Sequence, residues 1–163
     1  MENLKDIVNK ANGKLLPEAQ ANLEAWSSEA WLPAWAQETL VELINNERWD
    51  ELNNRFFKQN EFGTAGIRGR TISQMTPKSE MGTPSNLGAP EHAAVGSATL
   101  NDFNILRATA GLYKYCAKFE KTPQLVIAHD VRHFSRHFAE LTASAWVKLG
   151  GQALLFDAPR STP

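Results

Sequence analysis

Apolar residues recur at helical spacing through the first part of the chain, up to about residue 58. The pattern predicts one helix that is entered at residues 15–18 and runs through Leu23 and Trp26. A second helix is expected to begin near Pro33 and to carry Trp35 and Leu40 on one face, and a third, shorter one to begin near residue 48. Tryptophans at such spacing usually belong to a core or an interface rather than to a ligand stack. We therefore expect residues 1–58 to form a helical N-terminal extension.

The pattern changes at residues 71–97, which are rich in Thr, Pro, Ser and Gly and poor in large apolar residues. Such a composition predicts a long surface loop. Loops of more than about 15 residues within a compact domain are commonly functional or disordered. His92 lies in this segment and is expected to be solvated.

From residue 99 onward, helical and strand patterns alternate. A helix is expected over residues 101–119, with Thr99 or Asn101 as its N-cap, and a strand buried on both faces over residues 125–128. A second helix over residues 136–149, capped by Ser135 and ended by Gly150, precedes a strand at residues 153–156. This β-α-β order requires a parallel sheet and an α/β fold.

The sheet is expected to be incompletely covered, because no helical pattern follows residue 156. We therefore expect residues 59–163 to form an incomplete three-layer α/β/α domain that includes the loop at 71–97. An uncovered sheet face would leave apolar surface exposed and would favour self-association of the chain.

Composition excludes several classes of protein. The 163 residues are 42% hydrophobic and 21% charged, with a net charge of −1, so the chain can bury a core but lacks the broad positive surface of a nucleic-acid-binding protein. Cys116, the single cysteine, cannot form an internal disulfide and reads as a half-buried thiol. No apolar run is long enough for a membrane span or a secretory signal, which predicts a cytoplasmic protein with no membrane partner.

The segment EFGTAGIRGR, residues 61–70, carries the clearest chemical signal. Gly63, Gly66 and Gly69 occur at every third position, and glycine allows a positive φ or a close approach of the backbone to a ligand. Exposed N–H groups in such a turn form an anion-binding concavity, and Arg68 and Arg70 add planar cations suited to phosphate oxygens. The segment therefore predicts a site for a phosphorylated ligand, with a purely structural turn as the alternative.

Polar residues follow both predicted strands, at the sheet edge where ligands of parallel sheets bind. After the first strand come His129, Asp130 and Arg132, and after the second come Asp157 and Arg160. Asp130 and Arg132 could pair to shape a turn, or Arg132 could reach an anion. For Asp130 we favour capping of the next helix over direct catalysis, and His129 is either a general base or a polar residue satisfied at the strand end.

His133 and His137 stand one helical turn apart, which is a spacing able to hold a metal ion. No carboxylate motif lies between them and no third ligand is evident, so we expect no metal site in this chain.

Four segments in this order resemble the N-terminal part of the α-D-phosphohexomutases, the phosphoglucomutase and phosphomannomutase superfamily. They are FGTAGIRG at 62–69, GLYKY at 111–115, VIAHDVRHFS at 126–135 and PRSTP at 159–163. The resemblance covers about residues 60–163. The helical N-terminus and the long loop are similar to the larger phospho-sugar mutase branch of that superfamily.

The resemblance implies a four-domain enzyme that moves phosphate between C1 and C6 of a hexose through a phosphoserine and a bisphosphorylated intermediate. Mg²⁺ and a hexose bisphosphate activator would be its cofactors, and a hexose phosphate its substrate. By this resemblance Arg68 would stabilise charge on the transferring phosphoryl group. The phosphate-binding residues would be Gly63, Thr64, Gly66 and Arg68, with Arg70 and Arg132 as further candidates, and His129 and Asp130 would be structural near the site.

The chain departs from the superfamily in one important respect. It contains neither the T-A-S-H-N-P loop of the phosphoserine nor the D-x-D-x-D segment that would hold Mg²⁺. We therefore expect an N-terminal fragment of a phosphohexomutase that is inactive alone. A short non-catalytic sugar-phosphate-binding module and a partner-docking protein are the alternatives.

Overall fold

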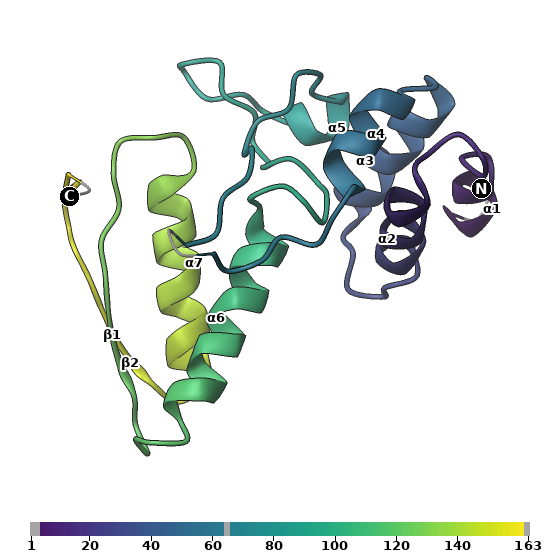
Figure 1. Ribbon diagram of the computed structural model, residues 1–163. Coiled ribbons are helices and arrows are strands. Elements are labelled where there is room, and N and C mark those ends of the chain that lie inside the picture. The colour runs from purple at the N-terminus through teal and green to yellow at the C-terminus, as the bar shows by residue number, and fades with distance from the viewer. Residues whose placement is uncertain (1–3, 64–65, 162–163) are drawn as a thin grey trace. The chain divides into compact units, whose positions relative to one another are not determined.

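A computed structural model describes residues 4–63 and 66–161 of the chain (Figure 1). The chain divides into two compact units, Met1–Leu100 and Asn101–Pro163, and each is described by itself. The predicted division between a helical extension, residues 1–58, and an incomplete α/β/α domain, residues 59–163, stays a prediction.

The first unit is a group of short helices: α1 (Leu4–Asn9), α2 (Pro17–Ser27), α3 (Ala34–Asn45), α4 (Trp49–Phe56) and α5 (Lys78–Met81). Helix α1 contacts α2 and α3, α4 packs on α2 and α3, and α5 packs on α3. The core between them includes Leu23, Leu40, Leu52 and Phe56, all fully buried. The three helices predicted in this region are confirmed as α2, α3 and α4.

Trp26 supports the prediction that tryptophans here serve packing. Its buried indole makes edge-to-face contacts with Trp31 and Phe56, each at a ring-centroid distance of 5.8 Å. Such aromatic pairs stabilise a core beyond the area that they bury.

The segment at 71–97 is only partly the surface loop that the sequence predicts. It contains α5, whose Glu80 is buried, and it leads into a fully buried run at residues 93–99. His92 is not simply solvated, because its ring stacks on Trp35 at 4.0 Å between centroids and 10° between planes. Small residues such as Ala, Gly and Ser give little hydropathy signal, which explains why composition alone misplaced this run.

The second unit alternates helix and strand: α6 (Asp102–Cys116), β1 (Gln124–Ile127), α7 (Ser135–Lys148) and β2 (Gln152–Leu155). The strands pair in parallel, with residue 124 opposite 152 and 127 opposite 155. Helix α7 packs on both strands, and α6 packs on α7, as Figure 1 shows. The predicted α/β fold with a parallel β-α-β unit is confirmed.

Of the three capping residues predicted for the helices of this unit, two are confirmed. The side chain of Asn101 caps α6 by accepting a 3.0 Å hydrogen bond from the Asn104 amide, and Gly150 takes a φ of +102° after the last turn of α7. Ser135 does not cap α7, because its hydroxyl accepts instead from the Asp130 amide. The N-cap position belongs to Phe134, in a left-handed conformation.

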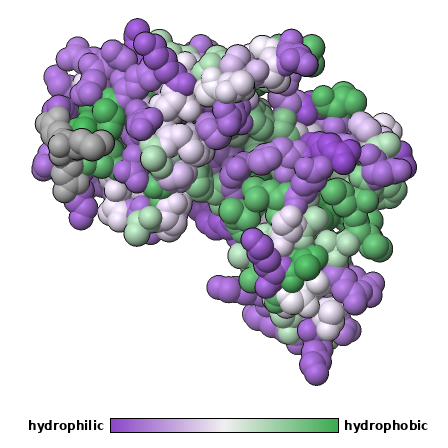
Figure 2. Space-filling view, turned by 180° about the vertical axis from the view of Figure 1, so that it is seen from behind, coloured by the Kyte–Doolittle hydropathy of each residue, from purple (hydrophilic) through white to green (hydrophobic). Residues whose placement is uncertain are grey.

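The expectation that the first strand is buried on both faces is wrong. Val126 of β1 is 63% exposed and Leu154 of β2 is 65% exposed, while alternate residues face α7. The predicted exposed apolar surface is therefore present on the sheet. Leu112, Tyr115 and Phe119 add apolar exposure along and beyond α6, and Figure 2 shows apolar patches on the surface of the molecule. Within the described residues, no helix is long and apolar enough to cross a bilayer.

Candidate phosphate-binding site

The glycine-rich segment forms a tight reversal of the chain. Gly63 and Gly66 exchange two backbone hydrogen bonds, with N···O distances of 3.2 and 3.0 Å, in an isolated antiparallel bridge. Gly66 has a φ of +80°, which a side chain would disfavour. Thr64, a predicted phosphate ligand, lies outside the described residues.

An open pocket of about 490 Å³ lies beside this turn. It is lined by Lys58, Gln59, Asn60, Glu61, Phe62, Gly63, Gly66 and Arg68. The structure thus brings Gly63, Gly66 and Arg68 together at one cavity, whereas Arg70 is not among the lining residues. Arg68 is exposed, and no carboxylate of the described chain forms an ion pair with it, so its guanidinium is available to an anion.

The segment at residues 58–70, which contains the pocket and the glycine-rich turn, is hydrogen-bonded at both ends to the chain at residues 97–100. The Asn60 amide donates to the Ser97 carbonyl at 2.7 Å, and the Ser97 hydroxyl donates to the Lys58 carbonyl at 2.7 Å. At the other end, the Leu100 amide donates to the Arg70 carbonyl at 2.8 Å. The backbone around the turn is therefore fixed by residues far away in the sequence, a role that sequence reasoning missed.

A buried ion-pair network of Arg55, Glu51 and Glu80 contacts the buried run at residues 93–99. Arg55 is 1% exposed and donates to Glu51 Oε1 at 2.7 Å and to both carboxylate oxygens of Glu80, at 2.7 and 2.9 Å. It also donates to the Val95 carbonyl, while the Val95 amide donates to Glu80. Burial opposes the charged guanidinium, but the bonds to Glu80 and Glu51 outweigh it, and the pKa of Arg55 is raised.

Gly69 and Gly63 form a matched pair for testing this arrangement. A Cβ at Gly69 would lie 2.8 Å from the Leu100 nitrogen and 2.9 Å from the Ala98 oxygen, whereas one at Gly63 would meet only an ordinary 3.6 Å contact. We expect Gly69→Ala to lower the free energy of unfolding by about 1–3 kcal/mol, as overpacking does. Gly63→Ala should change it far less. Chemical denaturation of the two variants measures the difference, and equal stabilities would contradict the close packing at Gly69.

The polar residues after β1 form a second, separate cluster. Asp130 accepts from the Arg132 amide at 3.0 Å and from Arg132 Nε at 2.7 Å. The two residues thus pair to shape a turn, which is one of the two predicted alternatives. Asp130 does not cap α7, contrary to the favoured expectation, because its carboxylate binds Arg132 instead. The hydrogen bonds from Arg132, side chain first and backbone second, lower the pKa of Asp130 to about 2.

His129 lies beneath this turn and is 5% exposed. Its Nδ1 is 3.3 Å from the Asp130 carbonyl oxygen, and its own carbonyl accepts from the Arg160 amide at 2.8 Å. These contacts join the ends of both strands and favour a structural role at the strand end over general base catalysis. Its Nε2 has no hydrogen-bond partner among the residues described.

The contribution of Asp130 to the stability of the fold should depend on pH. Because the folded-state pKa lies below the unfolded value of about 3.9, this carboxylate stabilises the fold above that value, and the contribution disappears as the pH falls through about 2. We expect Arg132→Gln to move the Asp130 pKa upward, toward the ordinary value. Carboxyl-carbon NMR titration of both proteins checks this, and an unchanged midpoint would show that Arg132 is not the cause.

Of the two histidines considered as metal ligands, only His137 lies on α7, because His133 precedes the start of that helix. His137 Nε2 lies 2.8 Å from Asp102 Oδ1 on α6, so it joins the two helices. Across residues 4–63 and 66–161, no group of three or more His, Cys, Asp or Glu side chains is arranged to hold a metal ion.

Comparison with known proteins identifies the type of domain. Residues 92–163 match the family model described as phosphoglucomutase/phosphomannomutase, alpha/beta/alpha domain I. This match agrees with the parallel β-α-β unit seen here, and the second unit is therefore a segment of that α/β/α type.

Curated relatives extend the similarity to most of the chain. The phosphoglucomutase of Staphylococcus epidermidis (strain ATCC 12228) is 26% identical over 133 residues, which is 82% of this chain and 20% of the relative. The phosphoglucomutase of Staphylococcus aureus (strain USA300) is 28% identical over 142 residues, 86% of this chain and 22% of the relative. These matches bear out the predicted resemblance to the phosphohexomutase superfamily, and the chain spans about a fifth of the length of these relatives. A search of solved structures gives no significant match.

Proposed function

We propose that this chain supplies the phosphoryl-binding turn of a phosphohexomutase, an enzyme that interconverts hexose 1-phosphate and hexose 6-phosphate through a phosphoserine. The observation that carries the proposal is the pocket at residues 58–68, where Gly63, Gly66 and the exposed Arg68 meet. Backbone N–H groups of a glycine turn and a guanidinium fork are the donors that phosphate oxygens require.

In this proposal Arg68 binds the oxygens of the transferring phosphoryl group and stabilises the charge that develops on them. The turn at Asp130 and Arg132 and the buried His129 shape the sheet edge rather than perform chemistry. Mg²⁺, the phosphoserine and the hexose bisphosphate activator would act with other domains of the complete enzyme, in the cytoplasm. The exposed apolar face of the sheet, which includes Val126 and Leu154, supports self-association of the chain by itself.

The chain alone should show no mutase activity, since its sequence has no T-A-S-H-N-P loop to carry the phosphoryl group. We expect no formation of glucose 6-phosphate from glucose 1-phosphate when the purified chain is assayed with Mg²⁺ and glucose 1,6-bisphosphate. A mock purification sets the background of the assay. Turnover above that background would contradict the proposal that phosphoryl transfer needs residues outside this chain.

A further inference from the structure

We propose that Lys58 is a second cation of the phosphate pocket and binds the same phosphate monoester group as Arg68. This inference rests on the proposed function, because it concerns the same pocket and the same ligand chemistry. Lys58 stands outside the glycine-rich motif, and its position on the pocket emerges only from the fold.

The fold places Lys58 beside Arg68. Lys58 and Arg68 are ten positions apart in the sequence but line one cavity. The wall that carries Lys58 is held rigidly, since its carbonyl accepts the Ser97 hydroxyl at 2.7 Å and Asn60, two residues on, is bonded to the same run. A fixed backbone reduces the entropy that a lysine must lose to bind an anion.

Lys58 also sets the charge of the pocket. Among the described residues that line the pocket, the charged ones are Lys58, Arg68 and Glu61, with a net formal charge of +1. Without Lys58 the formal charges of Arg68 and Glu61 would cancel, and only uncharged donors would remain to attract a phosphate dianion. Lys58 therefore supplies the charge that offsets Glu61.

The Lys58 ammonium is not held in an ion pair by any described residue. Its Nζ lies over the ring of Phe57, 5.3 Å from the centroid. A cation over the face of an aromatic ring at such an exposed position is held only weakly. Leaving the ring for a phosphate oxygen would cost little.

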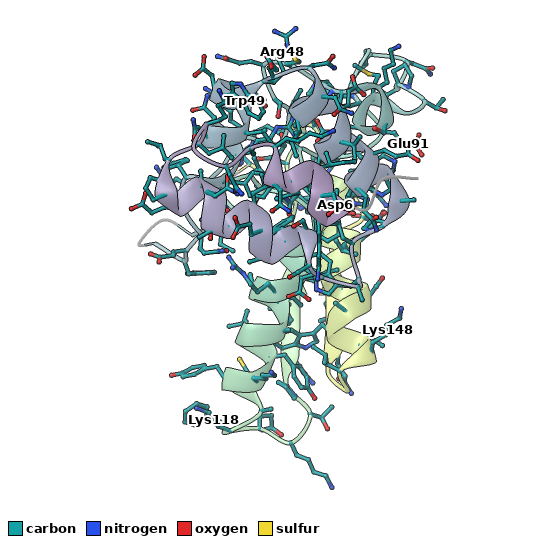
Figure 3. All side chains as sticks on the ribbon, turned by 90° about the vertical axis from the view of Figure 1, so that its right-hand side faces the viewer. Asp6, Arg48, Trp49, Glu91, Lys118 and Lys148 are labelled. Carbon is teal, nitrogen blue, oxygen red and sulfur yellow. The ribbon has the colours of Figure 1, made fainter. Side chains whose placement is uncertain are left out.

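The test is a phosphate titration of the 163-residue chain at constant ionic strength, followed by NMR of backbone amides. Inorganic phosphate and glucose 1-phosphate are the probes, and the variants are Lys58→Met, Lys58→Arg and Arg68→Met. Lys118→Met is the matched control, because Lys118 is an exposed lysine beyond α6 that extends into solvent (Figure 3). Thermal melts of every variant verify that the fold is retained.

We expect Lys58→Met to weaken binding of both probes about three- to tenfold, as the loss of one exposed charge near a dianion should. Lys58→Arg should bind both probes about as tightly as the unmodified chain, and Lys118→Met should leave binding unchanged. Unaltered affinity in Lys58→Met, while Arg68→Met loses binding, would overturn the role of Lys58 alone. Weakening for glucose 1-phosphate but not for phosphate would also overturn it. Absence of binding to the unmodified chain would overturn the phosphate pocket itself, and with it the proposed function.

Discussion

Glu80→Gln should lower the free energy of unfolding of the first unit by about 3–5 kcal/mol, the usual cost of breaking a buried ion pair by removing one partner. The substitution keeps the shape of the side chain but removes the charge that faces Arg55 at 2.7 Å, in surroundings where both side chains are 1% exposed. Since single domains are stable by only about 5–15 kcal/mol, this loss is a large fraction of the total. Urea denaturation followed by tryptophan fluorescence measures it, because Trp26 reports on the core of this unit.

The matched control is Glu38→Gln, which removes the same charge from an exposed position on α3 in the same unit. Its effect should stay within about 0.5 kcal/mol, as is usual for surface substitutions. If Glu80→Gln and Glu38→Gln proved equally stable, the ion pair would not hold the buried run at 93–99 in place.

Arg68→Lys should lower kcat about a hundredfold or more in a complete phosphohexomutase that includes this chain. Lysine keeps the charge but loses the planar fork that can bind two phosphoryl oxygens at once. Loss of one well-placed donor at a site of developing charge costs on the order of 3 kcal/mol in the transition state. Steady-state kinetics with glucose 1-phosphate, together with a thermal melt of the same variant, measures both effects.

A structural role for Arg68 predicts the opposite result, in which the melting temperature falls and kcat is nearly unchanged. Arg48→Lys serves as the control, because Arg48 is an exposed arginine of the same unit that precedes α4 and does not line the pocket (Figure 3). An unaltered kcat in Arg68→Lys would remove Arg68 from the catalytic machinery.

Much of the second unit could be predicted from the sequence, because its signals are local. The cap at Asn101, the glycine at the end of α7 and the two short apolar runs each act within a few residues of their own position. The identity of a helix cap depends on one side chain and the amides next to it, so a single sequence is enough to find it.

The support of the site could not be predicted in this way, because it depends on contacts between distant residues. Arg55 and Glu51 are spaced like any exposed helical pair. Nothing near them in the sequence marks Glu80, 25 positions after Arg55, as the second partner of Arg55. The same holds for Asn60, whose side-chain amide donates to the Thr99 carbonyl at 3.1 Å. The turn itself was recognisable from its glycines, but the backbone that holds it was not.

The backbone links around the pocket also bear on the order of folding. Lys58 and Asn60 reach their partners Ser97 and Thr99 across 39 positions of chain. Bringing the ends of such a long segment together costs entropy before any contact is gained, so contacts of this kind form after local helices do. The helices of the first unit can therefore form early, whereas the pocket at residues 58–68 takes shape only when the chain closes this loop. If the pocket binds phosphate as proposed, a bound phosphate would stabilise the closed loop, because a ligand stabilises the state that it binds.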